Sequence, residues 1–154
     1  GEFQQFAGEV AYGPADPGAT RISATIDVAS IHTREAARDA HLRSPDFFDV
    51  AKYPSLTFAS KKVEKVGDGQ YKVTGDLTMR GVTKPVVLRG MVLGVMPGER
   101  PRAGFEVTTT LNRLDYGVMY NRVLEGGGTM LGDDVEIRIN VEALRQPSAP
   151  PPAP

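Results

Sequence analysis

The feature that most constrains the fold of this chain is an alternation of apolar and polar residues that recurs along most of its length. The clearest case is the segment from Thr20 to Ser30, where every second residue from Ile22 to Val28 is apolar. The apolar residues of this segment are Ile22, Ala24, Ile26 and Val28. A period of two indicates a β-strand with one face against a core and the other toward water. The pattern therefore predicts an all-β protein whose sheet has one apolar face.

Six further segments show this pattern or a looser form of it, which gives about seven strands in total. They are 3–12, 56–63, 71–79, 86–95, 105–111 and 135–141. Several approach ~10 residues, more than the usual five or six. A long antiparallel meander with one apolar face most simply curls into a barrel or packs as a sandwich. In a barrel of about eight strands the interior is filled by side chains or holds one small ligand, and the inward residues here are compatible with both.

One block, Ser30 to Phe58, departs from the strand pattern. It begins with an alanine-rich, charged stretch that favours a helix from Thr33 to Leu42, with Thr33 as its N-terminal cap and Pro45 ending it. An aromatic-rich corner follows. Its aromatic residues are Phe47, Phe48 and Tyr53. We therefore expect a single short helical insertion that covers one end of the barrel.

The charged and aromatic side chains of this block each have two interpretations. Arg34 and Arg38 are four residues apart and would share one face of the helix, which is typical of a solvated, salt-bridged surface. Alternatively, one of them contacts the polar or anionic head of a ligand at the barrel mouth. The aromatic residues pack the insertion onto the barrel, and contact with the apolar tail of a ligand is a second role for them.

Composition and motifs argue against several classes of function. The net charge of -1 provides no basic surface for nucleic acid, and no apolar run is long enough to span a membrane. The absence of cysteine excludes disulfides, thiolate metal sites and cysteine nucleophiles. His32 and His41 are too far apart for a pair of metal ligands on one helical turn, and no G-x-S-x-G motif occurs. We therefore expect no enzyme, no cofactor and no metal; a metal ion between His32 and His41 would revive the enzyme hypothesis.

Three segments carry a specific resemblance to a known family. They read TREAARDAHLRSPDFFDVAKYPSLTFAS from Thr33, VTGDLTMRGVTKPVVL from Val73 and LGDDVEIRINVEAL from Leu131. Together with the opening GEFQQFAGEVAY, they resemble the YceI-like family. The likeness follows the family's order and covers nearly all of the chain ahead of its proline-rich end.

The resemblance implies an extended, lipocalin-like antiparallel β-barrel without a catalytic motif. Members of the family are associated with binding polyisoprenoids, including isoprenoid quinones, or other long-chain amphiphiles, and are typically exported to the bacterial periplasm or secreted. The family's first strand, and part of its second, would precede Gly1, so we expect this barrel to lack its first strand. We expect one domain over residues 1–144 and a disordered, proline- and alanine-rich tail over 145–154, and a homodimer is left open.

Our leading hypothesis is a non-enzymatic protein that carries or stores a long-chain isoprenoid lipid in an apolar barrel cavity. The alternation assigns the lining to Ile22, Ile26, Val28, Leu56, Phe58, Val73, Leu77, Met79, Phe105, Val107, Ile137 and Ile139. The lid and head-group candidates are Arg34, Arg38, Phe47, Phe48 and Tyr53. A register error of one residue would turn a strand's lining to the other face. The alternative is a structural or interaction module, with a solid core and an exposed sheet edge that recruits a protein partner.

Overall fold

The fold is built on one antiparallel sheet of seven strands. The computed structural model describes residues 1–12 and 16–146, so residues 147–154 of the predicted tail lie outside the described residues. The order of strands in the sheet is β2-β3-β5-β6-β7-β8-β9. Their bounds are β2 Phe6–Ala11, β3 Arg21–Asp27, β5 Ser55–Gly67, β6 Gln70–Met79, β7 Val82–Met96, β8 Arg102–Asn112 and β9 Asp134–Leu144. The predicted antiparallel meander is confirmed.

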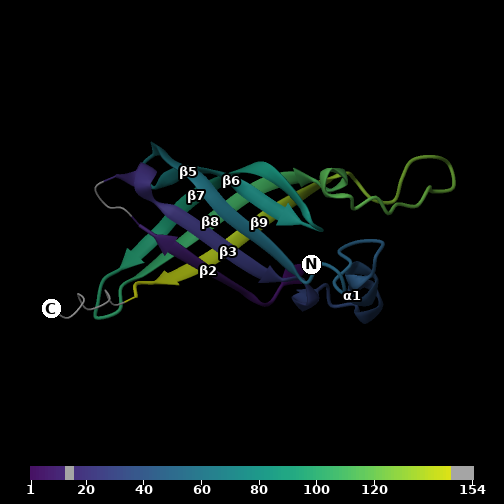
Figure 1. Cartoon of the computed structure of the whole chain (residues 1–154), viewed down its shortest axis with the longest axis horizontal. Coiled ribbons are helices and arrows are strands. Elements are labelled where there is room, and N and C mark those ends of the chain that lie inside the picture. The colour runs from purple at the N-terminus through teal and green to yellow at the C-terminus, as the bar shows by residue number, and fades with distance from the viewer. Residues whose placement is uncertain (13–15, 147–154) are drawn as a thin grey trace.

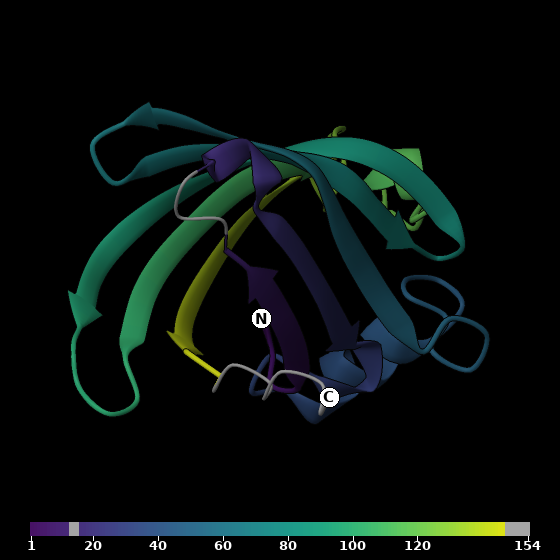
Figure 2. The ribbon, with the colours of Figure 1, turned by 60° about the vertical axis from the view of Figure 1, so that its left-hand side comes forward.

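The sheet curls into a half-barrel (Figure 2). β2 and β9 are its two edges, and within the described residues no pairing joins them. Register shifts between Ser60 and Lys62 in β5, and between Val92 and Gly94 in β7, mark bulges, which bend a strand and increase its twist. The all-β, barrel-type fold expected from the sequence is confirmed, with the barrel open between its edge strands.

The two ends of the half-barrel carry different structures. One end, here called the α1 end, carries the helix α1 (Ala36–Arg43) and the long segment 117–133, which projects beyond the sheet (Figure 1). The opposite end, here called the far end, holds the turns that join β5 to β6 and β7 to β8. The helical insertion therefore lies at one end of the barrel, as the sequence predicts.

The first predicted strand, 3–12, is broken in the structure. β1 (Glu2–Phe3) pairs with β4 (Ile31–His32), whereas β2 pairs with β3 across the 3₁₀ turn η1 (Pro17–Ala19). Between β1 and β2, the backbone N–H groups of Gln4 and Gln5 donate to the hydroxyl of Ser30 at 3.2 and 3.0 Å. The prediction of one continuous strand is wrong because Ser30, and not a neighbouring strand, accepts these two N–H groups.

The strand expected from Thr20 to Ser30 ends earlier, at Asp27. The Asp27 carboxylate accepts a hydrogen bond from the N–H of Ala29 at 2.9 Å and caps a short 3₁₀ turn, η2 (Val28–Ser30). Val28 therefore leaves the alternating face of β3. It is nonetheless only 2% exposed and belongs to the core.

The helix α1 begins later than the sequence predicts, and its N-cap is Glu35 instead of Thr33. Thr33 donates its backbone N–H to the Asp39 carboxylate at 2.8 Å, and its hydroxyl donates to the same oxygen. The cap prediction is wrong because the buried Asp39, inside the helix, takes up the polar groups of Thr33.

The hydrophobic core lies against the inner face of the sheet and is densest toward the α1 end. Its buried members are Val28, Leu56, Phe58, Val63, Val73, Met79, Val86, Leu111 and Tyr116. Most of them come from the parts of β5, β6, β7 and β8 nearest to α1, and Tyr116 comes from the 3₁₀ turn η3 (Arg113–Tyr116). Each fully buried apolar side chain contributes about 1.5–3 kcal/mol, so this end of the half-barrel is the better stabilised one.

Candidate functional site

The strand residues of the predicted lining share the inner face of the half-barrel, here called the concave face. Register pairs across neighbouring strands place them there. They are Ile22, Ile26, Leu56, Phe58, Val73, Leu77, Met79, Phe105, Val107, Ile137 and Ile139. Val28 is the exception, because it lies in η2, although it packs in the same core. The role of this face in ligand binding stays a prediction.

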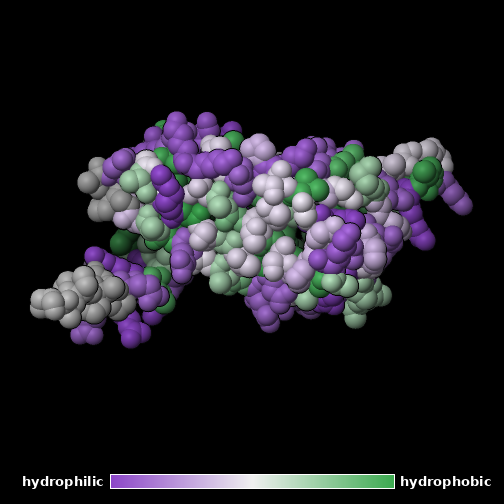
Figure 3. Space-filling model, viewed as in Figure 1, coloured by the Kyte–Doolittle hydropathy of each residue, from purple (hydrophilic) through white to green (hydrophobic). Residues whose placement is uncertain are grey.

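Burial along the concave face is uneven. At the α1 end, Leu56, Met79 and Leu111 are buried. At the far end, Val10 is 47% exposed and Val95 is 66% exposed, although register puts both on the same face. The space-filling view likewise shows patches of hydrophobic surface between the hydrophilic surfaces of the loops (Figure 3). Side chains therefore fill this face at one end and leave apolar surface uncovered at the other.

Phe58 lies across a glycine on the concave face. A Cβ added at Gly75 would lie 2.6 Å from Cζ of Phe58 and 2.4 Å from the carbonyl oxygen of Ala59. Gly75 pairs with Ser60, directly beside the bulge in β5. The bulge in β5 therefore lies opposite Gly75. Glycine is required here because the Phe58 ring occupies the space that a side chain would need.

The two arginines at the lid have different surroundings, although both are exposed. Nε of Arg38 donates to the Thr33 hydroxyl at 2.9 Å, and Nη2 donates to the Thr33 carbonyl oxygen at 2.9 Å. Arg34 has a φ of 64° and makes no hydrogen bond or ion pair within the described residues. Arg38 is thus engaged with the segment ahead of α1, and Arg34 is the arginine whose guanidinium is free for the predicted head-group contact.

The aromatic residues after α1 attach the insertion to its surroundings. Phe48 packs edge-on against Phe3, with ring centroids 5.6 Å apart, and contacts the core. The Phe47 ring lies 5.1 Å from that of Tyr120, in the projecting segment. Tyr53 lies against the turn between β6 and β7. All three residues make packing contacts of the kind the sequence suggests, and their contact with a ligand stays a prediction.

The two histidines face separate carboxylates. Nδ1 of His32 lies 3.3 Å from the Asp39 carboxylate, and Nε2 of His41 lies 2.8 Å from that of Asp46. The hydrogen bond from the Thr33 hydroxyl is the main reason that the pKa of Asp39 lies below its ordinary value. Across residues 1–12 and 16–146, no three His, Cys, Asp or Glu side chains gather into a group that would hold a metal ion. The structure does not bring His32 and His41 into one centre.

Comparison with known proteins places this half-barrel in a family. The model of the YceI-like domain matches residues 1–143. The chain belongs to the YceI-like family. It is 39% identical over 153 residues to a UPF0312 protein of Ectopseudomonas mendocina (strain ymp), an alignment that covers 95% of this chain and 74% of that protein. Protein YceI of Escherichia coli O157:H7 is also 39% identical over 153 residues, with the same two coverages.

Solved structures of YceI proteins share the fold. The crystal structure of a Campylobacter jejuni YCEI protein matches with a TM-score of 0.83 and 32% identity, over 95% of this chain and 84% of that chain. BcnA of Burkholderia cenocepacia matches with a TM-score of 0.76 and 26% identity, over 92% of this chain and 85% of that chain. The family and the barrel-type fold predicted from sequence are confirmed. In the described part of the chain, every helix is too short or too polar to cross a membrane.

One buried residue of this YceI-like chain escapes the sequence analysis altogether. Arg113 follows β8 in η3 and is only 7% exposed. Its guanidinium donates to the carbonyl oxygens of Val118 at 2.7 Å, Tyr120 at 2.9 Å and Gly132 at 2.8 Å. Arg113 thereby ties both ends of the projecting segment to the sheet. Alternation gives no signal for it, since buried arginines are rare and the residue lies just beyond a strand.

Proposed function

We propose that this YceI-like protein binds a long-chain isoprenoid lipid, either a polyprenyl chain or an isoprenoid quinone, and carries or stores it without catalysing a reaction. The observation that supports this proposal is the concave face, which is predominantly apolar but filled by side chains only at the α1 end. Contiguous apolar surface that stays exposed on a soluble protein indicates a surface that is covered in function.

An extended apolar chain suits the far half of the concave face. Phe105, Val107 and Ile139 are only partly buried there, so each has area left to cover. Burial contributes about 25 cal/mol per Å², or about 0.8 kcal/mol for each CH₂ group. Part of this gain is offset because the lipid chain loses conformational, translational and rotational freedom when it binds. The affinity of the face for a lipid is therefore expected to grow with each apolar group that reaches it.

Membership in the YceI-like family supports the same ligand class, because the family is associated with binding polyisoprenoids and other long-chain amphiphiles. It also supports a periplasmic or secreted location. The direct test extracts the purified protein with organic solvent and examines the extract by mass spectrometry. We expect a co-purified isoprenoid lipid, or uptake of an added prenylated quinone. A protein that carries no lipid and takes up neither quinones nor prenyl chains would refute the proposal.

A pair of neighbouring substitutions tests which face of the sheet binds. Ile26 lies on the concave face and Thr25, next to it in β3, is exposed on the opposite face. Ile26→Glu places an unpaired charge on the apolar face, which is costly, so we expect loss of lipid uptake or of stability. Thr25→Glu adds the same charge on the solvent side and should leave both unchanged. Wild-type stability and uptake in Ile26→Glu would show that the lining is assigned to the wrong face.

The sheet edges favour a second candidate, an interaction module that recruits a protein partner. Within the described residues, β2 and β9 each pair with one strand only, and an unpaired strand edge is a template for another chain. Sedimentation of the purified protein over a range of concentrations detects a homodimer built on such an edge. A lipid-free protein that self-associates, and in which a proline within β9 abolishes that association, would favour this candidate over lipid binding.

A further inference from the structure

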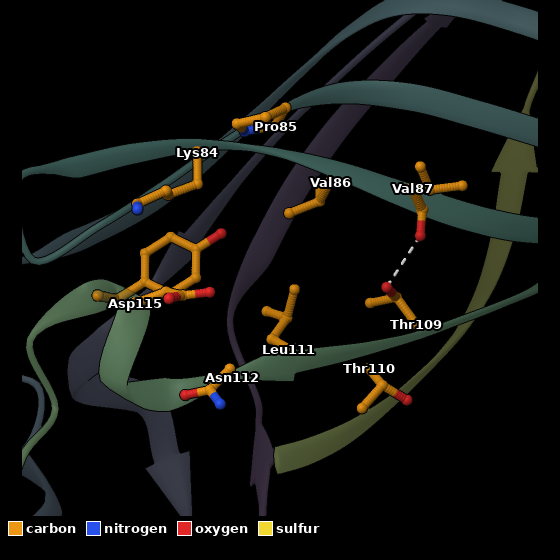
Figure 4. A pocket seen from close by; sticks show the side chains of 10 residues that line it. Lys84, Pro85, Val86, Val87, Thr109, Thr110, Leu111, Asn112 and Asp115 are labelled. Carbon is orange, nitrogen blue, oxygen red and sulfur yellow. Dashed lines mark hydrogen bonds between the residues drawn. The ribbon is translucent and has the colours of Figure 1, made fainter. Parts of the chain in front are cut away.

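Two neighbouring strands, β7 and β8, separate near the α1 end of the sheet (Figure 4). They pair only over their far halves, from Arg89 onward in β7. Nearer to α1, the Thr109 hydroxyl donates to the carbonyl oxygen of Val87 at 2.9 Å, in a stretch where no register pair of described residues joins the strands. Residues two apart in a strand turn their backbone groups to the same neighbour. Pro85 therefore lacks the N–H that would have faced β8, which favours the separation.

A hollow lies beside this separation on the outer face of the sheet, which is the face opposite the concave one. Its volume is about 760 Å³, within the range of roughly 300–1,000 Å³ typical of ligand pockets. Register and alternation turn most of its lining outward. These outward residues include Arg89 on β7, Thr108 and Thr110 on β8, and Glu136 and Arg138 on β9. The hollow is therefore distinct from the apolar concave face, and most of its lining is polar.

Two opposite charges line this hollow without meeting each other. Within the described residues, the side chains of Arg89 and Glu136 make no ion pair and no hydrogen bond. Arg89 pairs with Thr108, which pairs with Arg138, and Glu136 lies two residues along β9 from Arg138. Two strand spacings of about 4.8 Å and two residues of about 3.3 Å put the Cα atoms of Arg89 and Glu136 about 12 Å apart. A ligand that carries both charges can bridge them.

Neighbouring charges on the outer face do find partners. The Arg102 guanidinium lies 2.8 Å from the Glu142 carboxylate, on the same two strands that form one side of the hollow. Arg138 is the third charge of the hollow, and its Nε lies 3.9 Å from the carboxylate of Glu106. This pairing leaves one positive and one negative charge of the hollow available to a ligand, so the available lining has no net charge.

The surroundings of Arg89 favour a position of its guanidinium over the hollow. Register pairs Arg89 with Lys72 on β6, and like charges on opposite strands repel each other. On its other side lies β8, where the hydroxyls of Thr108 and Thr110 make no hydrogen bond within the described residues. A hydroxyl both donates and accepts. A polar group bound beside Arg89 therefore meets a charged donor and two unused hydroxyls.

We propose that this hollow is a second binding site, and that it takes a small zwitterion of the amino-acid class, with a carboxylate at one end and an ammonium group at the other. The guanidinium of Arg89 binds the carboxylate, because its fork of N–H donors matches the two oxygens. The Glu136 carboxylate accepts hydrogen bonds from the ammonium group. The hydroxyls of Thr108 and Thr110 lie between the two charges. This site goes beyond the proposed function and does not depend on it, since no part of the lipid lies on the outer face.

The test titrates the protein with three probes that share one carbon chain and follows the backbone amides by NMR. The probe 4-aminobutyrate carries both charges, butyrate only the carboxylate and butylamine only the ammonium group. We expect 4-aminobutyrate to bind the wild type roughly tenfold or more tightly than either single-charge probe, because each end forms a charge-assisted contact. Its binding should shift the amide signals of Thr108 and Glu136.

Two substitutions separate the roles of the two charges. Glu136→Gln should remove the preference for 4-aminobutyrate over butyrate and leave butyrate binding unchanged. Arg89→Gln should weaken butyrate and 4-aminobutyrate alike, by roughly tenfold, and spare butylamine. A merely structural role of either residue would change the binding of all three probes together. Glu142→Gln is the matched control, because Glu142 lies on the same face of β9 but outside the hollow, and it should leave the binding of all three unchanged.

Three results would overturn the site or its ligand class. Butyrate that binds the wild type as tightly as 4-aminobutyrate would exclude the zwitterion. Equal effects of Glu142→Gln and Glu136→Gln would show that the overall charge of the outer face attracts the probes, without a defined site. Amide signals that shift with none of the probes would refute binding in the hollow altogether.

Discussion

The contact between Phe58 and Gly75 gives the sharpest test of the concave face. Gly75→Ala would put a Cβ atom 2.6 and 2.7 Å from two ring carbons of Phe58 and 2.4 Å from the carbonyl oxygen of Ala59. The ring has little room to swing away because it is part of the buried core, and the carbonyl belongs to the backbone of β5. Overpacking of a core costs about 1–3 kcal/mol, and full expulsion of a buried phenylalanine about 3–5 kcal/mol. We therefore expect Gly75→Ala to lower the free energy of unfolding by about 2–3 kcal/mol.

Gly90→Ala is the matched control, since Gly90 also lies on the concave side of a strand but has room. Its added Cβ would meet the carbonyl oxygen of Tyr71 at 3.9 Å, an ordinary contact. Glycine is less favourable than alanine inside a strand by roughly 0.5–1 kcal/mol, so this variant should match or exceed the wild type. Thermal unfolding followed by circular dichroism measures both, with Gly75→Ala expected to melt roughly 5–10 °C lower. Equal midpoints for the two variants would refute the assigned packing of Phe58.

Two further predictions concern the α1 end. The Thr33 hydroxyl lowers the pKa of Asp39, so this carboxylate stabilises the lid above its unfolded pKa of about 3.9 and loses the effect as the pH falls through the lower, folded value. Relative to the intrinsic exchange rate at each pH, the amides of α1 in the wild type should lose protection from hydrogen exchange only at such acidic pH. In Asp39→Asn they should lose protection already at neutral pH, and unchanged protection in that variant would contradict the assignment. Arg113→Lys cannot reproduce the forked contacts to three carbonyl oxygens. It should lower stability by about 2–3 kcal/mol and speed exchange across 118–133, whereas equal exchange there would show that Arg113 does not hold this segment.

The alternation predicts the sheet well because side-chain direction along a strand depends on parity alone. Once β3 and β5 pair, Ile26 and Leu56 must point to the same face. The bulge in β5 shows the limit of this reasoning. Beyond Ser60 the register shifts by one residue, so the concave face passes from even-numbered residues such as Phe58 to odd-numbered ones such as Val63. An uninterrupted alternation would have put Val63 on the solvent side.

The predictions that are wrong fall where polar side chains compete for backbone groups. Asp27, Ser30 and Thr33 each bond to backbone or side-chain groups close to the ends of predicted elements. Such residues favour strand ends, turns and caps alike, and the partner that each one finds is set by the tertiary fold. Thr33 pairs with Asp39 only because that carboxylate is buried beside it. A local pattern contains no information on that burial, so it cannot choose between the competing bonds.

The uneven filling of the concave face restricts where a bound lipid can lie. Side chains fill this face at the α1 end, so the apolar chain of the proposed lipid would follow β8 toward the uncovered far end. From Leu111 to Ala103 this path spans about 26 Å at about 3.3 Å per residue. Contacts along it are apolar and non-directional, so they accept prenyl chains of many lengths. The affinity for a lipid should therefore rise with the apolar area that its tail covers, and level off once the tail is longer than this path.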